Sequence, residues 1–160
     1  MKTIITILFA KLVRTRNKKW ISSPIKWQKK TFNKLISSAS NTSFGKDHGF
    51  SEIVSYEDFK KKVPVRDYEG LKTYIEKIKN GESNVLWKGK PLYLAKTSGT
   101  TSGVKYIPIS KESISNHIDG ARNAILTYMA TTGKSEFAGG KMIFLSGSPV
   151  LERIGGIPTG

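Results

Sequence analysis

The stretch with the clearest chemical potential runs from Thr97 to Pro108 and is dominated at its start by serine, threonine and glycine. Its last glycine, Gly103, is followed two positions later by Lys105. Side chains this small and polar cannot build a hydrophobic core. They offer uncovered backbone N–H groups, hydroxyl donors and one positive charge, which are the groups that surround a bound polyphosphate. The composition therefore marks a candidate phosphate-binding loop.

The elements that must position this loop are two β-strands, which the alternating residues 92–96 and 105–109 predict on either side of it. A Walker A loop instead opens a helix and requires the pattern G-x-x-x-x-G-K-[ST]. Here Val104 stands five positions after Gly99, and Tyr106 follows Lys105, so the pattern is absent. The G-x-G-x-x-G pattern is absent as well. From the residues alone, a phosphate loop of another type and a plain flexible turn remain equally open.

Residues 98–105 resemble the phosphate loop of the adenylate-forming superfamily. The surrounding sequence is similar to one branch of it, the Gretchen-Hagen (auxin-responsive) family of acyl-acid amido synthetases. The resemblance covers nearly the whole chain, and its pieces are Phe44–His48, Val63–Val65, Asp67–Glu69, Gly81–Glu82, Leu86–Trp87, Thr97–Ser110 and Met142–Pro149. Some members of the family carry an extra residue between the last loop glycine and the lysine.

The resemblance implies an α/β fold, in which N-terminal helices precede the start of a large adenylate-forming domain with a mixed sheet flanked by helices. Residues 1–160 would form the N-terminal part of that one domain. Within it we expect a basic helical arm over residues 1–46 and the start of the α/β body, with the loop, over residues 85–160. Members of the family are much longer, so we expect the C-terminal domain to be absent here and the isolated chain to be inactive.

The resemblance also implies an ATP-dependent carboxylate ligase. Such an enzyme joins a carboxylate to the α-phosphorus of ATP as an acyl-adenylate, and the amine of an amino acid then displaces AMP to form an amide. The residues expected to hold the ATP phosphates, together with Mg²⁺, are Ser98, Gly99, Thr100, Thr101, Ser102, Gly103 and Lys105. None of them is expected to act as a nucleophile. Transfer to a thiol such as coenzyme A is one alternative, because the acceptor is chosen by segments that this sequence lacks. A non-enzymatic basic module that binds nucleic acid or a membrane surface is the other.

Charge is unevenly distributed along the chain. The sequence has 27 Lys or Arg against 12 Asp or Glu, a net charge of +15, and residues 1–46 hold 11 of the basic residues and none of the acidic ones. Such an arm suits nucleic acid or anionic lipid, but a pair of helices with solvated basic faces is the interpretation we favour. We expect no nucleic-acid partner, whereas contact of the basic N-terminus with a membrane surface stays open. The apolar run 4–10 is too short to span a bilayer.

Two amino-acid types limit the possible chemistry. The chain has no cysteine, which excludes disulfides, thiolate catalysis and cysteine-based zinc sites. Its two histidines, His48 and His117, are too far apart in sequence to give the spacing of metal ligands. We expect a cytoplasmic enzyme whose partners are a small carboxylic acid and an amino acid.

The remaining elements follow from caps and periodicity. A cationic, amphipathic first helix is expected, and Ser23-Pro24 should open a second whose apolar side includes Ile25, Phe32, Leu35, Ile36 and Ala39. Residues 41–49 are expected to form a polar turn, and residues 155–160 a turn without a closing strand. Ser55 with Asp58 predicts a capping box, and Asp67 should cap a helix that buries Leu71, Tyr74, Ile75 and Ile78 and ends at Asn80-Gly81.

A long helix is expected from Lys111 to Thr132, capped by Ser110 and followed by Gly133. Its spacing predicts a buried side that consists of Ile114, Ile118, Ala121, Ile125, Tyr128 and Met129. His117 should be a partly buried structural residue beside that side. Residues 141–146 predict a buried strand, which 147–149 should end.

Overall fold

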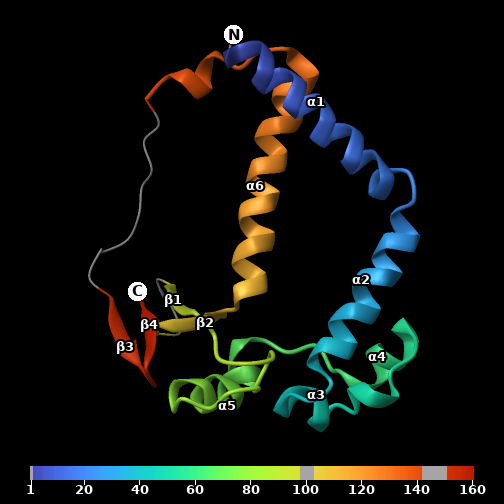
Figure 1. The fold of residues 1–160 in the computed structure, drawn as a ribbon. Helices are drawn as coiled ribbons and strands as arrows, with labels where there is room; N and C mark the ends of the chain where they lie inside the picture. The colour runs from blue at the N-terminus through green and yellow to red at the C-terminus, as the bar shows by residue number, and fades with distance from the viewer. Residues whose placement is uncertain (1, 98–102, 142–150) are drawn as a thin grey trace. The chain divides into compact units, whose positions relative to one another are not determined.

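The computed structural model describes residues 2–97, 103–141 and 151–160. Figure 1 shows the helices and strands, which in chain order are α1 (Lys2–Ile21), α2 (Pro24–Ala39), α3 (Ser43–Asp47), the 3₁₀ helix η1 (Phe50–Glu52), α4 (Tyr56–Lys62), α5 (Tyr68–Lys79), β1 (Tyr93–Thr97), β2 (Lys105–Ile109), α6 (Lys111–Thr132), the 3₁₀ helix η2 (Glu136–Gly139), β3 (Glu152–Ile154) and β4 (Ile157–Thr159). The chain divides into two compact units, residues 1–29 with 112–146 and residues 30–111 with 147–160. The expectation that 1–160 belong to one large domain stays a prediction.

The first unit is built from α1 and α6. Ala10 of α1 is fully buried against Leu126, Met129 and Ala130 of α6, with Val13 packed beside them. The helix α6 has the predicted bounds, and Gly133 follows it in the left-handed region at φ +71°, where glycine carries no side-chain penalty.

The predicted buried side of α6 is largely wrong. Met129 is buried as expected, but Ile118, Ile125 and Tyr128 are about half exposed. Ala121 and His117 are exposed as well, so His117 is not a partly buried structural residue. The reason is that the buried cluster of this unit occupies only the C-terminal third of α6, where α1 packs.

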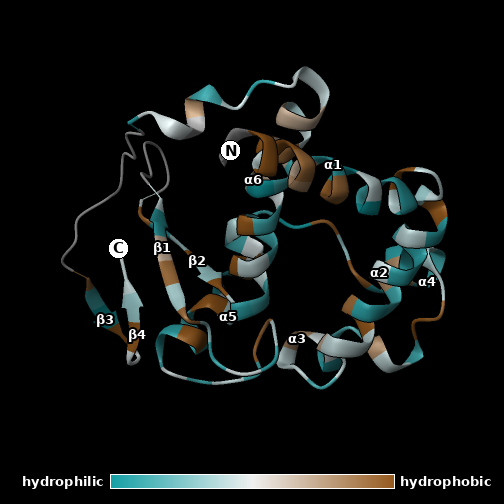
Figure 2. Ribbon diagram, turned by 45° about the horizontal axis from the view of Figure 1, so that its top comes forward, coloured by the Kyte–Doolittle hydropathy of each residue, from teal (hydrophilic) through white to brown (hydrophobic). Residues whose placement is uncertain are grey.

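The first helix forms as predicted, but its polarity is not arranged as expected. Most of its apolar residues lie in the N-terminal half, between Ile4 and Val13, four basic residues follow between Arg14 and Lys19, and Trp20 and Ile21 end the helix. Figure 2 shows this change of hydropathy along α1. The apolar and basic residues are thus separated along the helix more than around it, so the term amphipathic fits the whole helix poorly. Among the described helices, none combines the length and the apolar character that a membrane span requires.

The second unit contains a mixed four-stranded sheet in the order β2-β1-β4-β3. Strand β1 pairs antiparallel with β2 and parallel with β4, and β3 pairs antiparallel with β4. Helix α5 covers one face of this sheet, where Tyr74 and Ile78 pack with Val85, Leu94 and Ile157 (Figure 1). The predicted α/β class with a mixed sheet is confirmed, as are the strands on both sides of the loop, the first of them shifted by one residue.

The prediction of a turn without a closing strand at residues 155–160 is wrong, because β3 and β4 form a hairpin there. Gly155 and Gly156 make its turn at φ +57° and +80°. Each strand is only three residues long, too short for alternation to be recognised in the sequence. The predicted strand 141–146 lies, apart from Lys141, outside the described residues.

Several short elements surround a second buried cluster, made of Ile36, Ala39, Phe50 and Ile53. The expected polar turn at 41–49 is instead interrupted by α3, whose N–H of Gly45 donates to the Thr42 hydroxyl. The capping box of Ser55 and Asp58 at α4 is confirmed. Helix α2 begins at Pro24 as predicted, but Ile25 and Leu35 on its expected apolar side are 79% and 50% exposed.

Candidate functional site

The predicted phosphate loop connects two neighbouring antiparallel strands. Thr97, the last residue of β1, is paired with Lys105, the first residue of β2. The loop therefore begins and ends at the same end of one rigid hairpin. Ser98, Gly99, Thr100, Thr101 and Ser102 lie outside the described residues, whereas Gly103 and Lys105 lie within them.

Gly103 has a backbone conformation that favours glycine. Its φ is +76°, in the left-handed region, and a Cβ built on it would meet no atom within 4 Å. Glycine is therefore favoured at this position by the backbone conformation and not by crowding. The open space around it also leaves its backbone accessible to a ligand.

Lys105 carries a charge that no carboxylate neutralises among the described residues. Its Nζ lies 5.7 Å from the centre of the Tyr68 ring, a cation–π distance. The side chain is half-buried at the base of the loop. An aromatic face orients the ammonium group without satisfying it as a carboxylate would, so the charge stays available to an anion.

Tyr68 also protects the outer edge of the sheet. Its Oη accepts a hydrogen bond from the Tyr106 N–H at 3.0 Å. The Lys96 N–H donates to the Gly160 carbonyl, and the Gly160 N–H donates to the Leu94 carbonyl. The residues of β2 paired with Lys96 and Leu94 are Tyr106 and Pro108. Their backbone polar groups therefore point away from β1, toward the outer edge of the sheet. Proline has no N–H, and Tyr68 satisfies the other outward donor, which leaves this edge poorly suited to adding a strand.

Tyr68 is the residue of the candidate site that sequence reasoning missed. It is the first residue of α5, directly after Asp67, whose Oδ1 accepts the Gly70 N–H at 2.9 Å. The cap thus fixes where α5 begins, and so places Tyr68 beside the hairpin. The sequence contains Asp67-Tyr68-Glu69 as a family motif, but no spacing rule connects position 68 with position 105.

Two other lysines near the hairpin are already paired. Lys96 Nζ lies 2.6 Å from Glu152 Oε2, and this hydrogen bond raises the pKa of Lys96. Lys79 pairs with Glu76 at 2.8 Å, which raises the pKa of Lys79, and its Nζ also lies 5.0 Å from the Tyr106 ring. Both charges are compensated within the sheet and α5, in contrast to that of Lys105.

The family motif Phe44–His48 forms a structural network. His48 is buried, and its Nε2 accepts from Arg66 Nη2 at 3.0 Å, since guanidinium groups only donate. The proton is therefore on Nδ1, which donates to the Phe44 carbonyl at 2.8 Å. The Tyr74 hydroxyl donates to Asp47 at 2.8 Å. The pKa of Tyr74 is raised, chiefly because the hydroxyl is removed from water and secondly because of this hydrogen bond. The bond between Tyr74 and Asp47 holds α3 against α5. Both ring nitrogens of His48 are engaged in hydrogen bonds within the protein.

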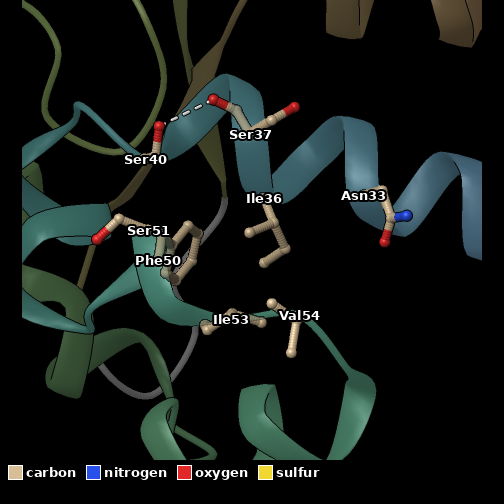
Figure 3. A pocket seen from close by; sticks show the side chains of 8 residues that line it. All are labelled: Asn33, Ile36, Ser37, Ser40, Phe50, Ser51, Ile53 and Val54. Carbon is tan, nitrogen blue, oxygen red and sulfur yellow. Dashed lines mark hydrogen bonds between the residues drawn. The ribbon is translucent and has the colours of Figure 1, made fainter.

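A surface pocket of about 470 Å³ lies between α2 and residues 50–54. Figure 3 shows Ile36, Phe50 and Ile53 at its apolar side and the hydroxyls of Ser37 and Ser40 turned to the helix. Ser37 donates to the Lys34 carbonyl and Ser40 to the Ser37 carbonyl. The backbone therefore satisfies these two hydroxyls, and the other polar side chains that line the pocket are Asn33 and Ser51. The loop remains the stronger candidate site.

Comparisons with known proteins identify the family of the chain. A sequence profile described as the GH3 family N-terminal domain matches residues 14–160. The chain belongs to the GH3 family. The predicted family is thereby confirmed, and the match includes β1, β2 and the loop between them.

Individual GH3 relatives are similar over parts of the chain. It is 39% identical over 94 residues to the indole-3-acetic acid-amido synthetase GH3.15 of Arabidopsis thaliana, covering 57% of this chain and 16% of that relative. It is 24% identical over 138 residues to the jasmonoyl-L-amino acid synthetase JAR4 of Nicotiana attenuata, covering 84% of this chain and 23% of that relative.

A solved structure has the same fold over most of the chain. The GH3.15 acyl acid amido synthetase superposes with a TM-score of 0.62 at 26% identity, covering 69% of this chain and 20% of that one. The chain thus spans about a fifth of the length of the GH3 proteins it resembles.

Proposed function

We propose that these residues are the ATP-binding front portion of an acyl-acid amido synthetase. The proposal rests on membership of the GH3 family and on relatives that are named as synthetases joining an acyl acid to an amino acid. The observation that carries it is the charge of Lys105, which no carboxylate among the described residues neutralises, at the base of a Ser/Thr/Gly-rich hairpin loop.

The described residues of this loop fit a triphosphate. Gly103 presents open backbone in the left-handed region, and Lys105 presents a charge beside an aromatic ring. Ser98, Thr100, Thr101 and Ser102 would add hydroxyl donors. No cluster of three or more potential metal ligands occurs in the described ranges 2–97, 103–141 and 151–160. Mg²⁺ would accompany ATP, whose phosphate oxygens are ligands of the kind this cation prefers.

In the proposed reaction, a carboxylate oxygen bonds to the α-phosphorus of ATP and the bond to pyrophosphate breaks. The amine of an amino acid then bonds to the acyl carbon, AMP leaves, and the amine loses a proton. Both partners of the first step are anions, so positive charge and aligned donors are needed where charge accumulates on the leaving pyrophosphate. Lys105 and the loop N–H groups would supply that stabilisation, and the two strands would hold them in place.

The test is Lys105→Ala in the full-length protein, with pyrophosphate–ATP exchange measured across a panel of carboxylic acids. We expect the exchange rate to fall on the order of a hundredfold, because one preorganised charge in the transition state is lost. The free energy of unfolding should fall by less than about 1 kcal/mol, since only the contact with the Tyr68 ring is lost.

Lys90→Ala is the matched control, because Lys90 is an exposed lysine of the same unit outside the hairpin. Equal exchange rates in the two variants would overturn the assignment of Lys105. Supplying an amino acid or coenzyme A as acceptor then identifies the product, and formation of a thioester alone would overturn the amide-forming step.

A further inference from the structure

The N-terminal half of α1 exposes a set of large apolar side chains. We call them the α1 apolar face, and they are Ile4, Ile5, Leu8, Phe9 and Leu12, each between 52% and 65% exposed. Their spacing of one, three, one and three positions places them on one side of a helix. Ala10 and Val13 lie on the opposite side and pack toward α6. These side chains are therefore exposed because they lie on the outer side of a helix whose inner side is packed, and not because the end of the helix is frayed.

The GH3 family profile does not include this face. The family match begins at residue 14, and every member of the α1 apolar face precedes it. Figure 2 shows the same segment as a concentration of hydrophobic residues at the start of α1. A soluble surface rarely gathers so many large apolar side chains without a partner.

The charge that follows the face indicates what that partner is. Arg14, Arg16, Lys18 and Lys19 are all exposed in the next two turns, and residues 1–46 contain no acidic residue. In α1, an apolar surface is followed by positive charge without any negative charge. Such a helix is complementary to a layer that is apolar inside and negatively charged outside. An anionic lipid surface has both properties, whereas nucleic acid would use the charge and leave the aliphatic side chains in water.

We propose that α1 docks on an anionic lipid bilayer, with its apolar face among the acyl chains and its basic half at the phosphate headgroups. Trp20, which is 51% exposed at the end of α1, would lie at the boundary between the two layers, where tryptophan is enriched. The helix would lie in the interface, because its apolar segment, residues 4–13, is too short to cross a bilayer. Apolar burial and charge act together here, and such paired signals are what stable surface anchoring requires.

The experiment is co-sedimentation of the full-length protein with vesicles of phosphatidylcholine, with and without phosphatidylserine. We expect binding that requires phosphatidylserine and weakens as salt is raised. Leu8→Asp should lower the partition coefficient at least about tenfold, because one buried aliphatic side chain is lost and a negative charge is added.

Val65→Asp is the matched control, since Val65 is fully exposed in the other unit and the change in charge is the same. It should leave binding unchanged. The double variant Lys18→Glu/Lys19→Glu should weaken binding about fivefold or more for each charge removed, and the loss should be confined to anionic vesicles.

Three results would overturn the proposal. One is absence of binding to any vesicle, which would mean that another part of the protein covers the face. Another is equal loss of binding in the variants Leu8→Asp and Val65→Asp. The third is tight binding to duplex DNA that Leu8→Asp leaves intact while vesicle binding is absent, because the basic residues would then serve nucleic acid.

Discussion

At the scale of single residues, Tyr68 connects a helix start to the candidate site through two different contacts. Its hydroxyl satisfies the outward N–H of Tyr106, and its ring lies beside the Lys105 ammonium group. The two contacts can be separated by substitution, because phenylalanine keeps the ring and leucine removes it.

We expect Tyr68→Phe to lower the free energy of unfolding by about 1 kcal/mol, because the Tyr106 N–H loses its partner. Its KM for ATP should stay near that of the unaltered protein. Tyr68→Leu should raise the KM for ATP as well, since Lys105 then loses the ring that orients it. Urea unfolding and ATP-dependent exchange measure the two effects. A KM for ATP that rises equally in both variants would contradict the role given to the ring.

Gly103 and Lys105 could be named as candidate phosphate-binding residues from the sequence because both belong to one continuous stretch. It did not predict Tyr68, which meets that stretch only after α5 has packed on the sheet. The same holds for His48, whose partner Arg66 is 18 positions away. The residue types in a segment indicate which chemistry it could perform, but the residues that orient those side chains are brought to them by the tertiary structure.

At the scale of elements, the capping box of α4 makes a prediction about pH. The Ser55 hydroxyl donates to Asp58, and this bond, with the N–H groups of Val54 and Ser55, lowers the pKa of Asp58 from its ordinary value. A lowered pKa means that the folded state favours the ionised carboxylate. The cap therefore stabilises the fold fully above about pH 4, the unfolded pKa, and this contribution is lost as pH falls through the lower folded pKa.

Asp58→Ala should accordingly lower the melting temperature at pH 7, and the difference from the unaltered protein should shrink as pH falls below 4. Glu82→Ala removes an exposed carboxylate outside any helix and serves as the control. A difference in melting temperature that stays constant from pH 7 to pH 2 would show that the carboxylate charge is not what caps α4.

The turn of the β3–β4 hairpin offers a second test of an element. A Cβ on Gly155 would lie 2.4 Å from the Lys79 carbonyl and 2.7 Å from the Gly81 nitrogen, whereas one on Gly156 would meet nothing within 4 Å. Both residues have positive φ. Gly156→Ala should cost about 1 kcal/mol of unfolding free energy for backbone strain alone. Gly155→Ala should cost ~3 kcal/mol or more, because the turn must also move away from α5.

Urea unfolding of the two glycine variants measures the difference. Equal losses would mean that the hairpin turn does not press against the end of α5. This contact also explains why the sequence did not predict the hairpin. The strands are stabilised by α5 and by β1, and residues 152–159 alone carry little alternation. By contrast, α5 could be predicted because Asp67, its apolar spacing and Asn80-Gly81 all lie within one segment.

At the scale of the whole molecule, the described chain forms two units with separate buried clusters, and each unit joins segments that are distant in sequence. The fold class was predictable because helices, a strand pair and a family resemblance all indicated it. The buried side of α6 was not, since periodicity identifies apolar residues but not the length over which a partner covers them. Leu126 and Ala130 are buried because α1 reaches them, and Ile118 is not.

The parallel pairing of β1 with β4 has a consequence for how the protein is made. Tyr93 at the start of β1 donates its hydroxyl to the carbonyl of Gly160, which lies 67 positions later in the chain. During translation, β1 and β2 can pair early, but the second edge of β1 must wait several seconds for the ribosome to supply β4. Over that interval β1 exposes an unpaired edge, the feature that chaperones recognise and that promotes aggregation. We therefore expect the yield of folded protein to depend on the speed of translation between β2 and β4.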